Sequence, residues 1–154
     1  MTRRSTIVLL SLAALAAAEP RAKNVILFMG DAAGIGVLNA ASIHGGKPQQ
    51  LFIQKMPHIG LMETSSASSW VTDSAAAMTA IVTGRKPHNG VISQSETAVR
   101  GKQDGEVLKT ILEYAEERGL STGVITNDRP TGATAAVCYA HSNDRKNAGE
   151  IFAQ

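Results

Sequence analysis

The sequence predicts an α/β fold in which helices flank a mainly parallel central sheet. Two observations predict it. Short apolar runs that end in turn residues are typical of buried parallel strands, and stretches with helical character alternate with them. The composition is that of a globular protein, with 44% hydrophobic and 18% charged residues among 154. In such folds ligands bind at the carboxyl ends of strands, so functional residues are expected there.

The first residues form a separate segment. Arg3 and Arg4 precede an apolar run over 7–18 that ends in three alanines. This pattern predicts a signal peptide over residues 1–18, followed by a domain over 19–154. An N-terminal membrane anchor or a buried helix is the alternative, although the run is short for crossing a bilayer. We therefore expect a secreted or periplasmic protein that is not stably inserted in a membrane.

The remaining elements follow in order along the chain. The apolar run at 24–29 ends at Gly30 and reads as the first strand. Alanine-rich or periodic stretches closed by glycine indicate helices. The predicted strands are 24–29, 59–63 and 122–126, and the predicted helices are 35–43, 75–82, 106–118 and 144–153.

Composition excludes several classes of function. The chain has 15 Lys and Arg against 13 Asp and Glu, and only 4% aromatic residues. This balance disfavours an electrostatic or stacking nucleic-acid binder, so no nucleic-acid partner is expected. The single cysteine, Cys138, excludes an intrachain disulfide and a cysteine-based metal cluster. It is expected to be a small buried apolar residue.

Two candidate sites lie early in the chain. Asp31 directly follows the first strand, where a carboxylate is a good ligand for Mg²⁺ or Zn²⁺, and a helix cap is an equally good interpretation. Ser74 opens an alanine-rich helix, whose positive N-terminal end favours an alkoxide and a phosphate. Ser74 could therefore be a nucleophile, although on spacing alone a capping role for Asp73 or Ser74 is preferred.

A third candidate site lies near the C-terminal end. Thr134 could offer its hydroxyl to a metal, and the fork of Arg145 could hold two phosphate oxygens. A helix-capping threonine and a surface arginine are the alternatives, and without other information they are preferred.

Taken in order, these segments resemble the alkaline phosphatase family. The resemblance covers essentially residues 23–154. It is carried by the run at 23–31, by Val71-Thr72-Asp73-Ser74-Ala75-Ala76-Ala77, by Asn89-Gly90, and by the stretches at 108–126 and 133–141. It implies the α/β fold of that family, and a secreted phosphate monoester hydrolase that is often dimeric.

The resemblance also implies roles for individual residues. Ser74 would be the nucleophile that is phosphorylated and then hydrolysed, and would bind metal through its oxygen. Arg145 would hold the phosphoryl group, and Asp73 would position that arginine. Asp31 would bridge a zinc and a magnesium site, and Thr134 would bind magnesium. Two zinc ions and one magnesium ion are the implied cofactors.

Three departures qualify these expectations. Ala32 stands where the family usually has glycine, which is expected to alter the local turn. Gly132 stands where the family has Asp or His near the third metal, which weakens the case for magnesium. Family members continue well beyond the point that matches Gln154, and their later half supplies most zinc ligands. We therefore expect an N-terminal portion with weak or no activity alone.

Two alternatives remain at this stage. One is a non-catalytic remnant that binds phosphate or a partner. The other is a phosphodiesterase or sulfatase of the same broad superfamily, although Ser74 together with Arg145 favours monoesters.

Overall fold

The structure is a computed structural model that describes residues 22–48 and 50–154. The proposed signal peptide lies outside the described residues. The chain divides after Gly30 into two units. Of the first unit the structure describes residues 22–30, which are extended and exposed. The second unit, residues 31–154, contains every helix of the described chain.

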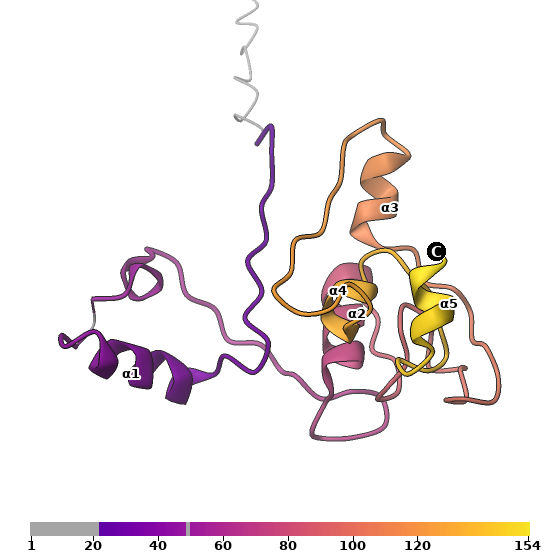
Figure 1. The fold of residues 1–154 in the computed structure, drawn as a ribbon, viewed down its shortest axis with the longest axis horizontal. Coiled ribbons are helices and arrows are strands. Elements are labelled where there is room, and N and C mark those ends of the chain that lie inside the picture. The colour runs from indigo at the N-terminus through magenta and orange to yellow at the C-terminus, as the bar shows by residue number, and fades with distance from the viewer. Residues whose placement is uncertain (1–21, 49) are drawn as a thin grey trace, which may run out of the picture. The chain divides into compact units, whose positions relative to one another are not determined.

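Helices are the regular elements of the second unit (Figure 1). Helix α2 packs against both α3 and α4. No helix among the described residues is long and apolar enough to cross a membrane. The helices are α1 (Ile35–His44), the 3₁₀ helix η1 (Phe52–Lys55), α2 (Ser74–Thr83), α3 (Ile111–Glu116), α4 (Ala133–Ala136) and α5 (Ala148–Phe152).

The ends of α2 follow from local chemistry. The Asp73 side chain accepts a hydrogen bond from the backbone N–H of Ala76 at 3.0 Å, so it caps the helix. Gly84 ends the helix in the left-handed region at φ 76°. The prediction for this helix is confirmed to within a residue at each end.

The core of the second unit is built from small residues around α2 and α4. Ala75, Ala136 and Ile151 are fully buried, and Cys138 is buried beside them, as expected. Burial raises the pKa of the Cys138 thiol, which keeps it in its neutral form. Because alanine side chains are short, α2 and α4 approach closely enough to bring their first residues together.

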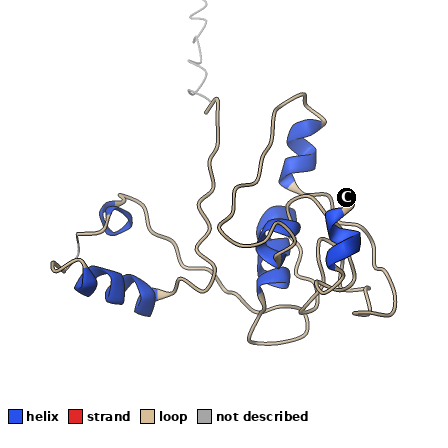
Figure 2. Ribbon diagram, viewed as in Figure 1, coloured by secondary structure: helices blue, strands red, loops and turns tan. Residues whose placement is uncertain are grey.

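The predicted sheet is absent from residues 22–48 and 50–154. The segments 24–29, 59–63 and 122–126 are extended, but none is a strand (Figure 2). The strand prediction is therefore wrong for these residues. A strand is defined by a hydrogen-bonded neighbour, and these segments have none within the described chain. Paired backbone is limited to isolated bridges at Ile92–Ser142, Gln94–Val107 and Val99–Gln103.

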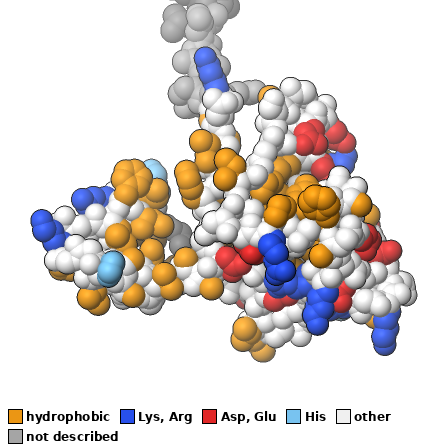
Figure 3. Space-filling view, in the orientation of Figure 1, with side chains coloured by type: hydrophobic (Ala, Val, Ile, Leu, Met, Phe, Trp, Pro, Cys, Tyr) orange, Lys and Arg blue, Asp and Glu red, His pale blue; other side chains and the backbone are white. Residues whose placement is uncertain are grey.

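The unpaired segments leave apolar side chains on the surface. Phe28 is 88% exposed, Leu61 99% and Ile125 is fully exposed. Figure 3 shows further hydrophobic side chains gathered over α1 and η1. Helix α1 therefore forms as predicted but buries few of its own apolar residues.

Two predicted helices are shorter than expected. Helix α3 begins at Ile111 because Thr110 caps it, with Glu113 closing a reciprocal capping box. The preceding residues are held in extended form, since the Leu108 N–H donates to the Ser93 carbonyl. Helix α5 covers only the middle of the predicted stretch 144–153.

Candidate active site at the start of helix α2

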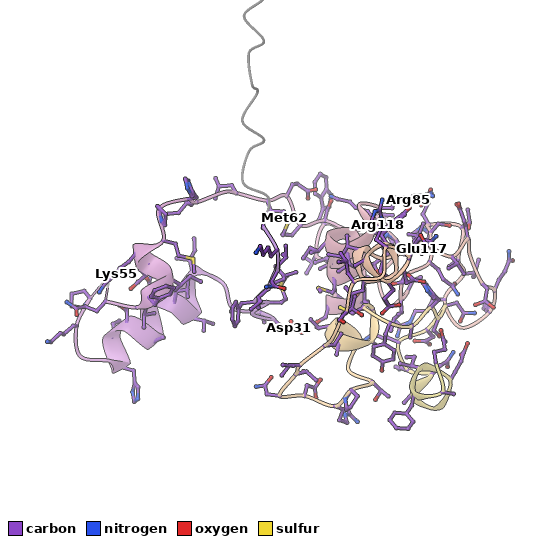
Figure 4. The ribbon with its side chains drawn as sticks, turned by 90° about the horizontal axis from the view of Figure 1, so that it is seen from above. Asp31, Lys55, Met62, Arg85, Glu117 and Arg118 are labelled. Atoms are coloured by element: carbon purple, nitrogen blue, oxygen red, sulfur yellow. The ribbon has the colours of Figure 1, made fainter. Side chains whose placement is uncertain are left out.

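A carboxylate and two hydroxyls meet at the first residue of α2. Ser74 Oγ donates to Asp31 Oδ2 at 2.9 Å, and Thr134 Oγ1 donates to the same oxygen at 2.8 Å. Asp31 is exposed and is labelled in Figure 4. The three predicted metal-binding residues are thus brought together from segments far apart in sequence. All three offer oxygen, the ligand type that suits Mg²⁺.

An ion pair stands directly beside this cluster. Arg145 Nη1 lies 3.0 Å from Asp73 Oδ2, and Asp73 is the residue before Ser74. Burial alone would raise the pKa of Asp73. Hydrogen bonds from backbone N–H groups and the charge of Arg145 outweigh that effect and hold the pKa below its ordinary value. Asp73 therefore stays ionised and keeps the guanidinium next to the Ser74 hydroxyl.

The turn at Asn89-Gly90 ties the two groups together. The Asp73 N–H donates to Asn89 Oδ1 at 3.3 Å, and Asn89 Nδ2 donates to the Val71 carbonyl at 3.0 Å. The Arg145 N–H donates to the Gly90 carbonyl at 2.8 Å. Gly90 has φ +87°, and an added Cβ would lie 2.4 Å from a neighbouring guanidinium, so a larger residue does not fit.

This positioning role of Asn89 was not predicted from the residues themselves. The Asn-Gly pair indicated a turn, but nothing in the spacing showed that the amide would reach back sixteen residues to Asp73. The only available signal was the resemblance to a family motif.

The residue after Asp31 has an unusual backbone. Ala32 lies in the left-handed region at φ 54°, a conformation that glycine adopts without a steric cost. The expected altered turn is therefore absent: this chain keeps a glycine-like turn with alanine. The strain is on the order of 1 kcal/mol.

The oxygen cluster fits magnesium better than zinc. Asp31 and Thr134 supply two hard oxygens, and Mg²⁺ commonly keeps several waters as its other ligands. Zinc sites in proteins take three or four protein ligands. Within residues 22–48 and 50–154, no three His, Cys, Asp or Glu side chains are grouped to hold a metal. These residues alone do not fit a zinc pair.

Histidine does not complete the site. The His141 ring binds the Ser93 carbonyl oxygen through Nδ1 at 2.8 Å and lies 3.2 Å from Glu113 through Nε2. Both ring nitrogens are therefore engaged in holding α3 to the core. This agrees with the expectation that His141 is not a metal ligand.

Comparison with known proteins identifies the family. A model of the alkaline phosphatase family matches residues 22–154. The chain belongs to the alkaline phosphatase family. It is 36% identical over 137 residues to alkaline phosphatase 4 of Drosophila melanogaster, covering 82% of this chain and 23% of that protein. It is 34% identical over 134 residues to the human tissue-nonspecific alkaline phosphatase isozyme, covering 80% and 26%.

Solved alkaline phosphatases share the fold. The enzyme from the Antarctic bacterium TAB5 matches with a TM-score of 0.67 and 32% identity, over 79% of this chain and 33% of that one. The Thermus thermophilus alkaline phosphatase matches with a TM-score of 0.61 and 29% identity, over 75% and 24%. A variant of the TAB5 enzyme was solved with magnesium bound in its M3 site.

The fold of this alkaline phosphatase chain is thus similar to that of its family, although the described residues form helices and almost no paired strands. The chain spans about a quarter of the length of the curated relatives it matches.

Proposed function

We propose that the protein carrying this chain hydrolyses phosphate monoesters through a phosphoserine formed at Ser74. The observation that carries the proposal is the placement of the Ser74 hydroxyl. It lies at the start of α2, bonded to the Asp31 carboxylate and next to the Asp73–Arg145 pair. Membership of the alkaline phosphatase family supports the reaction class.

The residues divide the work among them. Arg145 binds the phosphoryl oxygens and offsets the charge that develops on them, and Asp73 fixes its direction. Asp31 orients the Ser74 Oγ, and the partial positive charge at the start of α2 favours the bound anion. The Ser74 oxygen bonds to phosphorus while the ester oxygen departs with the electron pair. Water then releases phosphate, so that its oxygen ends on phosphorus and the alcohol leaves with a proton.

Magnesium is the metal that the described residues support. Asp31 and Thr134 would hold it, and when bound it would stabilise negative charge near the reacting oxygens. Gly132 offers no side chain to this site. For the expected zinc pair, the described residues offer the Asp31 carboxylate and the Ser74 oxygen. Further ligands would have to come from outside them.

The compartment is part of the proposal. The sequence pattern over residues 1–18 supports export from the cytoplasm, which suits an enzyme that acts on phosphate esters outside the cell.

Replacing the nucleophile tests the reaction. In the protein that carries this chain, Ser74→Ala should lower turnover of phenyl phosphate on the order of a thousandfold or more, because the covalent step is lost. Ser121→Ala, an exposed serine away from the site, is the matched control. Acid quenching followed by mass spectrometry should locate phosphate on Ser74. Near-normal turnover in Ser74→Ala would exclude Ser74 as nucleophile.

A second candidate is phosphate binding without turnover. The sparse set of metal ligands in the described residues favours it. Zinc stoichiometry distinguishes the two candidates, because the enzyme requires tightly held zinc and a phosphate-binding remnant does not. A preference for diester over monoester substrates would instead favour the phosphodiesterase alternative.

A further inference from the structure

An open pocket of about 300 Å³ lies on the far side of Arg145 from the ideas developed above. Its wall carries three cationic side chains, Arg129, Arg145 and Lys146, and one carboxylate, Asp128. The volume is at the lower end of the range for small-molecule sites, which is roughly 300–1,000 Å³. The pocket therefore has room for a small anionic group next to the arginine that binds phosphate in the proposed function.

The charges in the pocket are unbalanced. Arg145 is already paired with Asp73. Arg129 and Lys146 form no ion pair within the described part of the chain, whereas Arg85, Arg100 and Lys109 each do. Two cations thus face one carboxylate, and a positive charge is left over.

Glycine at position 132 brings the carboxylate of Asp128 close to the backbone. A Cβ added to Gly132 would lie 2.3 Å from Asp128 Oδ2, so any larger residue would displace that carboxylate. Asp128 consequently sits against the pocket wall and contributes the one negative charge there.

We propose that this pocket binds a second phosphate, adjacent to the phosphoryl group that is transferred. The substrate class is then a phosphoanhydride such as pyrophosphate. This inference rests on the proposed function, because Arg145 belongs to both. Arginine and lysine are the side chains that best recognise phosphate, and an anionic leaving group gains from their charge as it departs.

The reaction is balanced for inorganic pyrophosphate. The Ser74 oxygen bonds to one phosphorus, the bridging P–O bond breaks, and the second phosphate leaves with the electron pair. Water then hydrolyses the phosphoserine, so that one pyrophosphate and one water give two phosphates.

The test compares a doubly charged ligand with a simple one. We expect Arg129→Gln with Lys146→Gln to lower kcat/KM for pyrophosphate roughly tenfold, since hydrogen bonds to charged groups are lost. The value for phenyl phosphate should change less than about twofold, because that leaving group has no charge to bind. Lys102→Gln, another exposed lysine in no printed ion pair and outside the pocket, is the matched control.

Binding measurements separate this inference from the proposed function. Calorimetry should show weaker pyrophosphate binding in the double variant and unchanged binding of inorganic phosphate. Asp128→Asn should act in the opposite sense and strengthen pyrophosphate binding, which a merely structural role would not produce. Equal losses for both ligands, or no loss for either, would overturn the inference. Absent turnover with a selective loss of pyrophosphate binding would overturn the proposed function and leave the pocket assignment supported.

Discussion

Asp73 combines two roles in one side chain. One carboxylate oxygen accepts the N–H of Ala76 and caps α2, and the other binds Arg145. The capping interpretation and the positioning interpretation of Asp73 are therefore not alternatives. The aspartate fixes the start of the helix and the direction of the arginine at once.

The lowered pKa of Asp73 gives a pH signature. A carboxylate whose pKa is lowered on folding adds stability above its unfolded pKa, ordinarily 3.8, and loses it as pH falls through the folded value. Asp73→Asn keeps a capping side chain but removes the charge. We expect the variant to be less stable by about 1 kcal/mol at neutral pH.

Denaturant unfolding of both proteins at a series of pH values measures this effect. The stability difference between them should shrink as pH falls below the ordinary value of 3.8, because every other acid titrates alike in both. A difference that is constant down to the acid limit would show that the ionised Asp73–Arg145 pair does not stabilise the fold.

Individual site residues were predictable because each follows a local signal. Asp31 comes after an apolar run, and Ser74 begins an alanine-rich helix. Which of them meet was not predictable from spacing alone, since Asp31 and Thr134 are 103 residues apart. Arg129 and Lys146 had no local signal at all, because their shared pocket exists only after folding.

At the scale of elements, helices were predicted better than strands. The limits of α1 and α2 depend on caps and glycines within a few residues, which a sequence displays directly. The segments 24–29 and 122–126 have the right residues for strands, but a strand also needs a neighbour. Periodicity carries no information about whether that neighbour is present.

Two glycines offer a matched test of how helices end. An added Cβ meets nothing within 4 Å at either Gly84 or Gly149, so packing plays no part. Gly84 ends α2 at φ 76°, and Gly84→Ala should lower the free energy of unfolding by about 1 kcal/mol. Gly149 lies inside α5, and Gly149→Ala should raise it by roughly 0.5–1 kcal/mol.

Equilibrium denaturation of the two variants and the parent provides the measurement. The opposite signs are the essential result. If both substitutions changed stability in the same direction, backbone conformation would not be what distinguishes the two positions.

At the scale of the whole molecule, burial is unevenly distributed. The residues around α2 and α4 form a closed core, whereas the extended segments expose large apolar side chains. Extended backbone with unpaired N–H and C=O groups is a template for pairing with another strand. The described chain thus combines a finished site region with unfinished sheet segments.

Hydrogen exchange should report this division. In the 154-residue chain, amides of residues 24–29 should exchange quickly, because no hydrogen bond holds them. The amides of Ile92 and Ser142, which donate to each other's carbonyls and belong to buried residues, should exchange slowly. Exchange followed by mass spectrometry tests both. Strong protection over 24–29 would mean that a strand pairs with this segment.

The wide spacing of the site residues also has a consequence for synthesis. Asp31 leaves the ribosome 103 residues before Thr134, which at about 5–20 residues per second is a delay of roughly 5–20 s. Throughout that interval the Ser74 hydroxyl has been made but its arginine has not. The order of translation itself therefore keeps a nascent chain from reacting with phosphate esters until its last site residue has emerged.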